Sequence, residues 1–260
     1  MATEPRVPDA AGIVLAGGRS TRMGTAKAAL EWHGSTLLAR VTGLLLRAVA
    51  GPVVVARAPG QPLPQLPGAV EVVDDPDEGL GPMHGIASGL GAVAARTARA
   101  FVCSTDLPLL HPAFVRAVLA RLGPGVDVVM PQALGHPQPL AAAYRTAIVG
   151  HLHGLLAAGR VRPARDLTEL RVERPDAAVL LGDPALAAAD PHLDSLLNVN
   201  RIEEYRAARA RPAPLVTVLT SSGPVEVRAA TRGAASAAVG WAVDDPDAPL
   251  VPGDVVDLHG

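Results

Sequence analysis

A loop near the start of the chain gathers glycine and positive charge. Residues 11–16 are apolar, Gly17 and Gly18 follow, and three cations then precede any acid: Arg19, Arg22 and Lys27. Glycines let backbone N–H groups approach an anion, and the cations suit a polyphosphate. The loop is neither a Walker A loop nor a GxGxxG fingerprint. From these residues alone, a solvated basic loop stays open as the alternative.

The composition singles out a few polar residues. Lys27 is the only lysine among 23 basic residues, and Asn198 and Asn200 are the only asparagines. In a chain that uses arginine almost everywhere else, the remaining lysine and asparagines are candidates for positions where Arg or Asp would fail chemically. Chance retention is the alternative.

Aspartates follow two other apolar segments. Asp106 comes directly after the apolar run at residues 101–105, and the Leu107-Pro108 pair that follows it is expected to end the strand. Asp75 closely follows the apolar run at residues 70–73. At the carboxyl end of a parallel strand, a carboxylate faces the same crevice as the basic loop. Because Mg2+ takes oxygen ligands and keeps several waters, one aspartate and one amide oxygen suffice on the protein side. A turn or a helix cap is the alternative role.

The elements that must position these residues alternate along the chain. Continuous apolar runs predict strands at residues 11–16, 52–56, 70–73, 101–105 and 126–130, as expected for strands covered on both faces. Helices are predicted at residues 36–50, 85–98 and 112–122. This alternation predicts an α/β fold, a three-layer αβα Rossmann-like sheet that is mostly parallel.

A second unit is predicted near the carboxyl end. Residues 1–10 form a tail, residues 11–210 the main domain, ending in a helix at 202–210, and residues 211–214 a proline-rich linker. Residues 215–260 are predicted to form a small ββαβ module, with strands at 215–220, 225–229 and 255–258 and a helix capped by Thr231.

Composition excludes several classes of protein. The 260 residues carry a net charge of −2 and few aromatic residues, which argues against nucleic-acid binding. The single cysteine, Cys103, excludes intramolecular disulfides and sites with several thiolates. The sequence shows neither a signal peptide nor an apolar run long enough to span a membrane, so a cytoplasmic protein is expected.

Several motifs together resemble one family. L-A-G-G-x-S-x-R-M-G, followed closely by Lys27, resembles the signature loop of nucleotidyltransferases with a glycosyltransferase-A-like fold, most closely the molybdenum cofactor guanylyltransferases. S-T-D-L-P around Asp106 resembles the D-x-P metal motif of that family, and N-V-N resembles its second polar ligand. The stretch from Asp75 through G-P-M-H-G-I-A-S-G-L resembles its third motif. The resemblance spans about residues 11–207.

The resemblance implies a role for each matching residue. Catalytic roles fall to Arg22, Lys27 and Asp106. Nucleotide contacts fall to Leu15, Ala16, Gly17, Gly18, Arg19, Ser20, Lys27, Asp75, Gly81 and Asp106. The cofactor is Mg2+, held by Asp106 and Asn200, and the acceptor is bound by Gln138, Arg145, Arg160 and Asn198. The chain departs from the family at Ala26, where many members have Asp, and at Ala56, where some have Asn.

The implied reaction is attack by the terminal phosphate of a molybdopterin-type acceptor on the α-phosphorus of GTP, with release of pyrophosphate. The same chemistry with CTP or another phosphorylated acceptor is one alternative, and a non-catalytic nucleotide-binding scaffold is another. Proteins of molybdenum cofactor insertion or biosynthesis are the partners implied. The tail is similar to ubiquitin-like sulfur carriers but ends in His259-Gly260 instead of Gly-Gly, which indicates a degenerate β-grasp module without thiocarboxylate chemistry.

Overall fold

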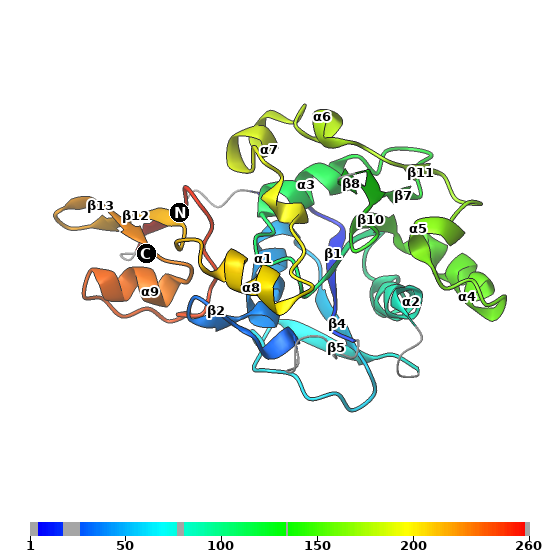
Figure 1. The fold of residues 1–260 in the computed structure, drawn as a ribbon, viewed down its shortest axis with the longest axis horizontal. Coiled ribbons are helices and arrows are strands. Elements are labelled where there is room, and N and C mark those ends of the chain that lie inside the picture. The colour runs from blue at the N-terminus through cyan, green and yellow to red at the C-terminus, as the bar shows by residue number, and fades with distance from the viewer. Residues whose placement is uncertain (1–4, 18–26, 77–80, 134, 258–260) are drawn as a thin grey trace.

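The apolar runs that the sequence marks as strands lie side by side in one sheet (Figure 1). The computed structural model describes residues 5–17, 27–76, 81–133 and 135–257, and within them this sheet has seven strands. Their spatial order is β11 (Val172–Glu173), β7 (Val128–Val129), β10 (Ala141–Arg145), β6 (Arg99–Ser104), β1 (Ala10–Leu15), β4 (Val53–Arg57) and β5 (Val70–Asp74). All strands except β10 run parallel, which confirms the mostly parallel sheet.

Three strands of this sheet differ from the sequence prediction, and one of them, the short edge strand β11, was not predicted at all. β10 was not predicted as a strand, and it lies antiparallel between β6 and β7, with Ala141 opposite Cys103 and Arg145 opposite Arg99. β5 was predicted to be covered on both faces, but it is the edge strand of the sheet, and Val72 is 44% exposed. The prediction was wrong because an apolar run reports β propensity and not the number of neighbours that a strand finds.

Helices cover both faces of the sheet, which gives the three layers expected (Figure 1). Val14 of β1 belongs to the core cluster that buries α1 (Leu37–Ala48), α3 (Pro112–Ala120) and α7 (Pro184–Ala189) on one face. Ile13 and Leu15 point to the other face and pack with α2 (Pro82–Val93) and α4 (Val149–Ala157). This alternation is the period of two that a strand imposes on its side chains.

Shorter elements fill the connections. They are the hairpins β2 (Glu31–Trp32) with β3 (Ser35–Thr36) and β8 (Gln132–Ala133) with β9 (His136–Pro137), the helices α5 (Pro163–Asp166), α6 (Ala177–Leu180) and α8 (Ile202–Arg209), and 3-10 turns at Lys27–Ala29, Thr146–Ile148 and Asp194–Leu196. None of the described helices has the length and apolar character that crossing a bilayer needs.

The carboxyl-terminal module has the ββαβ order expected. β12 (Leu215–Thr220) pairs with both β13 (Gly223–Arg228) and β14 (Val255–Asp257), and α9 (Arg232–Ala238) lies between β13 and β14 in the chain. Thr231 caps α9 by accepting a hydrogen bond from the backbone N–H of Ala234 at 3.2 Å. The module has its own small core, formed by Val216, Val218, Ala229, Ala235, Leu250 and Val256.

Arginines of α1 fasten this module to the main domain. Arg47 donates two hydrogen bonds of 2.7 Å to the Asp254 carboxylate. The guanidinium of Arg40 donates to the carbonyl oxygens of Ala230 and Leu250 at 3.3 Å. The two units are therefore joined by contacts of defined geometry as well as by the linker.

Gly89 and Gly91 of α2 offer a matched pair of tests of the packing between helix and sheet. A Cβ on Gly89 would lie 2.4 Å from Cγ2 of Ile13, whereas one on Gly91 would have Val149 as its nearest neighbour, at 3.8 Å. We expect Gly89→Ala to lower the free energy of unfolding by about 1–3 kcal/mol through overpacking. Gly91→Ala should raise it by up to about 1 kcal/mol, because alanine favours the helix. Urea denaturation of both variants checks this, and equal midpoints would contradict the packing.

Candidate active site

Three polar side chains from distant parts of the chain meet at one edge of the sheet. The Lys27 ammonium donates to Asp106 Oδ2 at 3.0 Å and to Asn200 Oδ1 at 3.2 Å. Lys27 opens the 3-10 turn after the basic loop, Asp106 lies two residues beyond β6, and Asn200 lies two residues before α8. The side chains of Lys27 and Asp106 are only 17% and 13% exposed. The structure thus brings together the only lysine, the D-x-P aspartate and one of the two asparagines.

Neighbouring groups hold the Asp106 side chain and the backbone of both residues. The Ser104 hydroxyl donates to Asp106 Oδ1, and the backbone N–H of Val199 donates to the Asp106 carbonyl at 3.0 Å. The N–H of Asn200 donates to Glu204 Oε2 at 2.7 Å. Sequence reasoning missed Ser104 and Glu204, although a glutamate in the first turn of a helix is a known capping signal.

The oxygen atoms of Asp106 and Asn200 are the type of ligand that a hard divalent cation prefers. Asp106 and Asn200 both direct an oxygen at the same positive group, the Lys27 ammonium. Among the described residues, no cluster of three or more His, Cys, Asp or Glu side chains could hold a metal ion. A cation at this edge would therefore take two protein oxygens and complete its coordination with phosphate or water, as Mg2+ commonly does.

A second part of the site surrounds Asp75. A Cβ on Gly17 would lie 3.7 Å from Asp75 Oδ2, and one on Gly85 would lie 3.5 Å from it, so glycines keep the space beside this carboxylate open. Within the described part of the chain, Asp75 Oδ1 is buried and accepts no hydrogen bond. Burial raises the pKa of Asp75, against a smaller lowering effect of a hydrogen bond with Ser88. Such an oxygen fits a ligand that brings an N–H or O–H donor.

The backbone leading into the basic loop is held by a residue that sequence reasoning missed. Leu15 ends β1, and the N–H of Ala16 donates to the Ala56 carbonyl at 2.8 Å. Gln61 Nε2 donates to the Ala16 carbonyl at 2.9 Å, and Gln61 Oε1 accepts from the N–H of Ala58 at 3.1 Å. Gln61 lies in a proline-rich segment, and no sequence motif there predicts a contact with the Ala16 carbonyl.

Gly81 stands at the N-cap of α2 with φ +92°, a conformation that favours glycine. A Cβ on it would lie 3.9 Å from the carbonyl oxygen of Val161, which follows Arg160. Because Gly85, in the first turns of the same helix, lies beside Asp75, the start of α2 belongs to the same edge of the sheet.

The predicted acceptor residues separate into two groups. Asn198 Nδ2 donates to Gln138 Oε1 at 3.4 Å, so these two side chains meet next to the Asn200 segment. Arg160 donates to Glu169 Oε1 at 2.5 Å and to the Asp166 carbonyl at 2.6 Å. Its role toward an acceptor stays a prediction.

Arg145 lies apart from the other predicted site residues. It lies opposite Arg99, the first residue of β6, whereas Asp106 lies beyond the last one, so the sheet separates the two. Its guanidinium donates to backbone carbonyls at 2.7–3.0 Å, those of Leu122, Gly123 and Val126. Because β10 runs antiparallel, its last residue lies at the end of the sheet opposite Asp106, and the role of Arg145 toward an acceptor stays a prediction.

Four other predicted contact residues, Gly18, Arg19, Ser20 and Arg22, lie outside the described residues, as does Ala26. The roles that the sequence predicts for them stay predictions.

Comparison with known proteins places these features in context. A family model described as "MobA-like NTP transferase domain" matches residues 12–174. A relative from Mycobacterium tuberculosis H37Rv, named "Probable molybdenum cofactor guanylyltransferase", is 42% identical over 57% of this chain and 74% of its own length. A relative with the same name from Mycolicibacterium paratuberculosis is 37% identical over 77% of this chain and 96% of its own length.

Solved structures show the same fold. Molybdopterin-guanine dinucleotide biosynthesis protein A from Archaeoglobus fulgidus superposes with a TM-score of 0.60 at 20% identity, covering 76% of this chain and 96% of the other. The 2-C-methyl-D-erythritol 4-phosphate cytidylyltransferase from Thermus thermophilus gives 0.51 at 15% identity, covering 76% and 97%. At these identities the likeness concerns the fold of the chain.

Proposed function

Because the chain belongs to the family of MobA-like NTP transferase domains, we propose that it transfers GMP from GTP to the terminal phosphate of molybdopterin and releases pyrophosphate. The name of its curated relatives supports the choice of substrates. The observation that carries the proposal is the convergence of Lys27, Asp106 and Asn200 at the edge of the sheet where the basic loop begins.

This reaction does not require a strong general base, because the attacking phosphate is already an anion. An oxygen of the acceptor phosphate, already anionic, forms a bond to the α-phosphorus, and the bond from that phosphorus to the α,β-bridging oxygen breaks. The electron pair leaves with pyrophosphate, and the product carries a new P–O–P linkage. Such reactions depend mainly on positioning and on neutralising charge.

Different residues of the candidate site position the substrates and neutralise their charge. Lys27 supplies a positive charge to the triphosphate, and Ser104 and Glu204 keep the Asp106 and Asn200 segments in place. Asp106 and Asn200 would hold Mg2+, a cation that neutralises the charge of phosphates when bound. The buried Oδ1 of Asp75 accepts a hydrogen bond from the base or the sugar of the nucleotide.

Thermal unfolding with Mg2+ and GTP, CTP, ATP or no nucleotide tests the choice of nucleotide. Ligand at about 100 times its Kd adds roughly 2.7 kcal/mol, which raises the midpoint by about 5 °C or more at this size. We expect this shift with GTP alone. A shift with CTP instead would indicate a cytidylyltransferase, and no shift with any nucleotide would contradict the proposed function.

The reaction itself is tested by supplying molybdopterin as acceptor. We expect pyrophosphate and the GMP-linked product to appear in equal amounts. GTP hydrolysis without transfer to the acceptor would contradict the proposal.

A further inference from the structure

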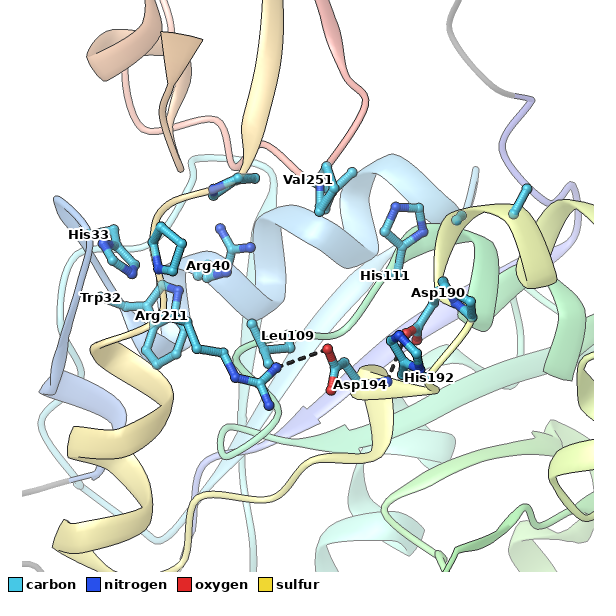
Figure 2. A pocket seen from close by; sticks show the side chains of 16 residues that line it. Trp32, His33, Arg40, Leu109, His111, Asp190, His192, Asp194, Arg211 and Val251 are labelled. Carbon is cyan, nitrogen blue, oxygen red and sulfur yellow. Dashed lines mark hydrogen bonds and ion pairs between the residues drawn. The ribbon is translucent and has the colours of Figure 1, made fainter.

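A cavity of about 520 Å3 lies between the main domain and the carboxyl-terminal module (Figure 2). Its lining residues include none of Lys27, Asp106 and Asn200. Its walls come from the β2–β3 hairpin, α1, the loop before α3, the end of α7 and the segment after it, the linker and the module. Representative lining residues are Trp32, Arg40, Leu109, Asp190, Arg211 and Val251.

The family model ends at residue 174, so the linker and module walls lie outside the part of the chain that it matches. The relative from Mycolicibacterium paratuberculosis is matched over 96% of its length by only 77% of this chain, so part of this chain has no counterpart there. The cavity therefore does not follow from the family fold alone.

The walls are mostly apolar. Trp32, Leu109 and Val251 line the cavity together with proline and alanine side chains. Val251 lies on one side, and the ion pair between Arg211 and Asp194 closes the other (Figure 2). Pockets that bind small molecules have volumes of roughly 300–1,000 Å3, apolar walls and a few polar groups. This cavity has that size and character.

Arg40 places a charge in the wall that forms no ion pair with the described residues. Its side chain comes from α1, and the residue is only 4% exposed. Its guanidinium donates to three carbonyl oxygens, Pro108 at 2.7 Å and Ala230 and Leu250 at 3.3 Å. These bonds use three of the five N–H donors of a guanidinium.

Neutral carbonyls do not cancel the charge of Arg40, and in the described part of the chain no carboxylate forms an ion pair with it. Burial, together with the nearby charge of Arg47, lowers the pKa of Arg40 to about 10, against a smaller raising effect of Asp254, which is itself paired with Arg47. Arg40 is therefore protonated at neutral pH. Buried charges are normally paired, so this position favours an anion.

The acids in the cavity wall already have partners. The carboxylate of Asp190 accepts the backbone N–H groups of Asp194 and Ser195 at 2.7 and 3.0 Å. The carboxylate of Asp194 accepts from Arg211 at 2.9 Å. Burial, together with the nearby charges of Arg209 and Arg40, lowers the pKa of His33, so this ring is neutral at pH 7. Arg40 is therefore the charged group that recognises a ligand.

We propose that this cavity binds a small organic anion, with a carboxylate or phosphate at Arg40 and an apolar body against Trp32, Leu109 and Val251. The lining residues of this cavity are different from Lys27, Asp106 and Asn200, and the proposal is independent of the proposed transferase activity.

Trp32 provides the readout for the experiment. The chain has two tryptophans, so Trp241→Phe leaves Trp32 as the only reporter of the cavity. In this variant of the full-length protein, the fluorescence of Trp32 is titrated with phenyl phosphate, 3-phenylpropionate, neutral benzyl alcohol and inorganic phosphate. We expect saturable binding of at least one aromatic anion, with both benzyl alcohol and inorganic phosphate at least tenfold weaker. The tighter anion identifies the headgroup class.

Two variants on the same helix locate the binding site. Ala189 lines the cavity, whereas Ala185, also in α7, does not. Ala189→Phe should weaken anion binding at least tenfold, and Ala185→Phe should leave it unchanged. Arg40→Met should abolish it, and the α7 pair keeps the test decisive if that variant does not fold.

Three results would overturn the proposal. They are no saturable binding of either aromatic anion to the folded protein, equal affinity for benzyl alcohol, and binding that Ala189→Phe does not weaken. None of these measurements uses GTP, so a failure here is distinct from a failure of the nucleotide experiment.

Discussion

Turnover of GTP is expected to fall by about 10²- to 10³-fold when Lys27 is replaced by alanine, the range seen when one charge-stabilising group is removed from an active site. The Lys27 ammonium lies 3.0 Å from Asp106 Oδ2 and 3.2 Å from Asn200 Oδ1, in a position to neutralise phosphate charge. Because the ion pair of Lys27 with Asp106 is largely buried, the substitution also lowers the free energy of unfolding, by more than the roughly 1 kcal/mol of an exposed pair. The turnover number and the unfolding midpoint, measured on the same preparation, separate the two effects.

Lys27→Arg is the informative control for this substitution. The other 22 basic residues of the chain are arginine, so the sequence tolerates that side chain widely. The ammonium is a compact point charge that fits between two oxygens, whereas a guanidinium is planar and bulkier. We expect Lys27→Arg to fold and yet to recover little activity. Full recovery would show that charge alone suffices, and a loss of stability that matches the loss of turnover would contradict a catalytic role.

The layered sheet was predictable because its signals are local. Continuous apolar runs marked β1, β4, β6 and β7, and the start of α3 at Pro112 follows from its proline. The motifs around Lys27, Asp106 and Asn200 indicated side chains at the carboxyl ends of parallel strands, where the structure brings them together. The strands and the start of α3 needed only the residue types and their neighbours in the chain, whereas the joint site of Lys27, Asp106 and Asn200 rested on the resemblance to a known family.

The features that the sequence did not predict depend on contacts between residues far apart in the chain. The direction of β10 is set by its pairing with β6 and β7, and that direction carries Arg145 to the edge opposite Asp106. The contact between Gln61 and the Ala16 carbonyl joins residues 45 positions apart and has no motif. The cavity beside Arg40 likewise forms only after the module docks on α1.

Asp106→Asn is expected to lower turnover by about 10³-fold, at the upper end of single electrostatic contributions. Asparagine keeps the size of the side chain and one oxygen that can accept from Ser104, but it removes the negative charge that balances Lys27 and would hold Mg2+. The affinity for GTP should therefore lose its dependence on Mg2+. Turnover and the GTP-induced thermal shift, each measured with Mg2+ and with EDTA, check the two effects.

Asp127→Asn is the matched control. Asp127 lies immediately before β7, at the end of the strands opposite Asp106, and it forms an ion pair with Arg171. This substitution removes the same charge from a carboxylate that has no part in the candidate site, so turnover should stay within about twofold of the unmodified protein. If both variants lose activity equally, the loss at Asp106 reflects folding and not chemistry. If the thermal shift of Asp106→Asn with GTP still depends on Mg2+, then Asp106 is not the metal ligand, and Lys27 contacts the triphosphate without a metal ion held by Asp106.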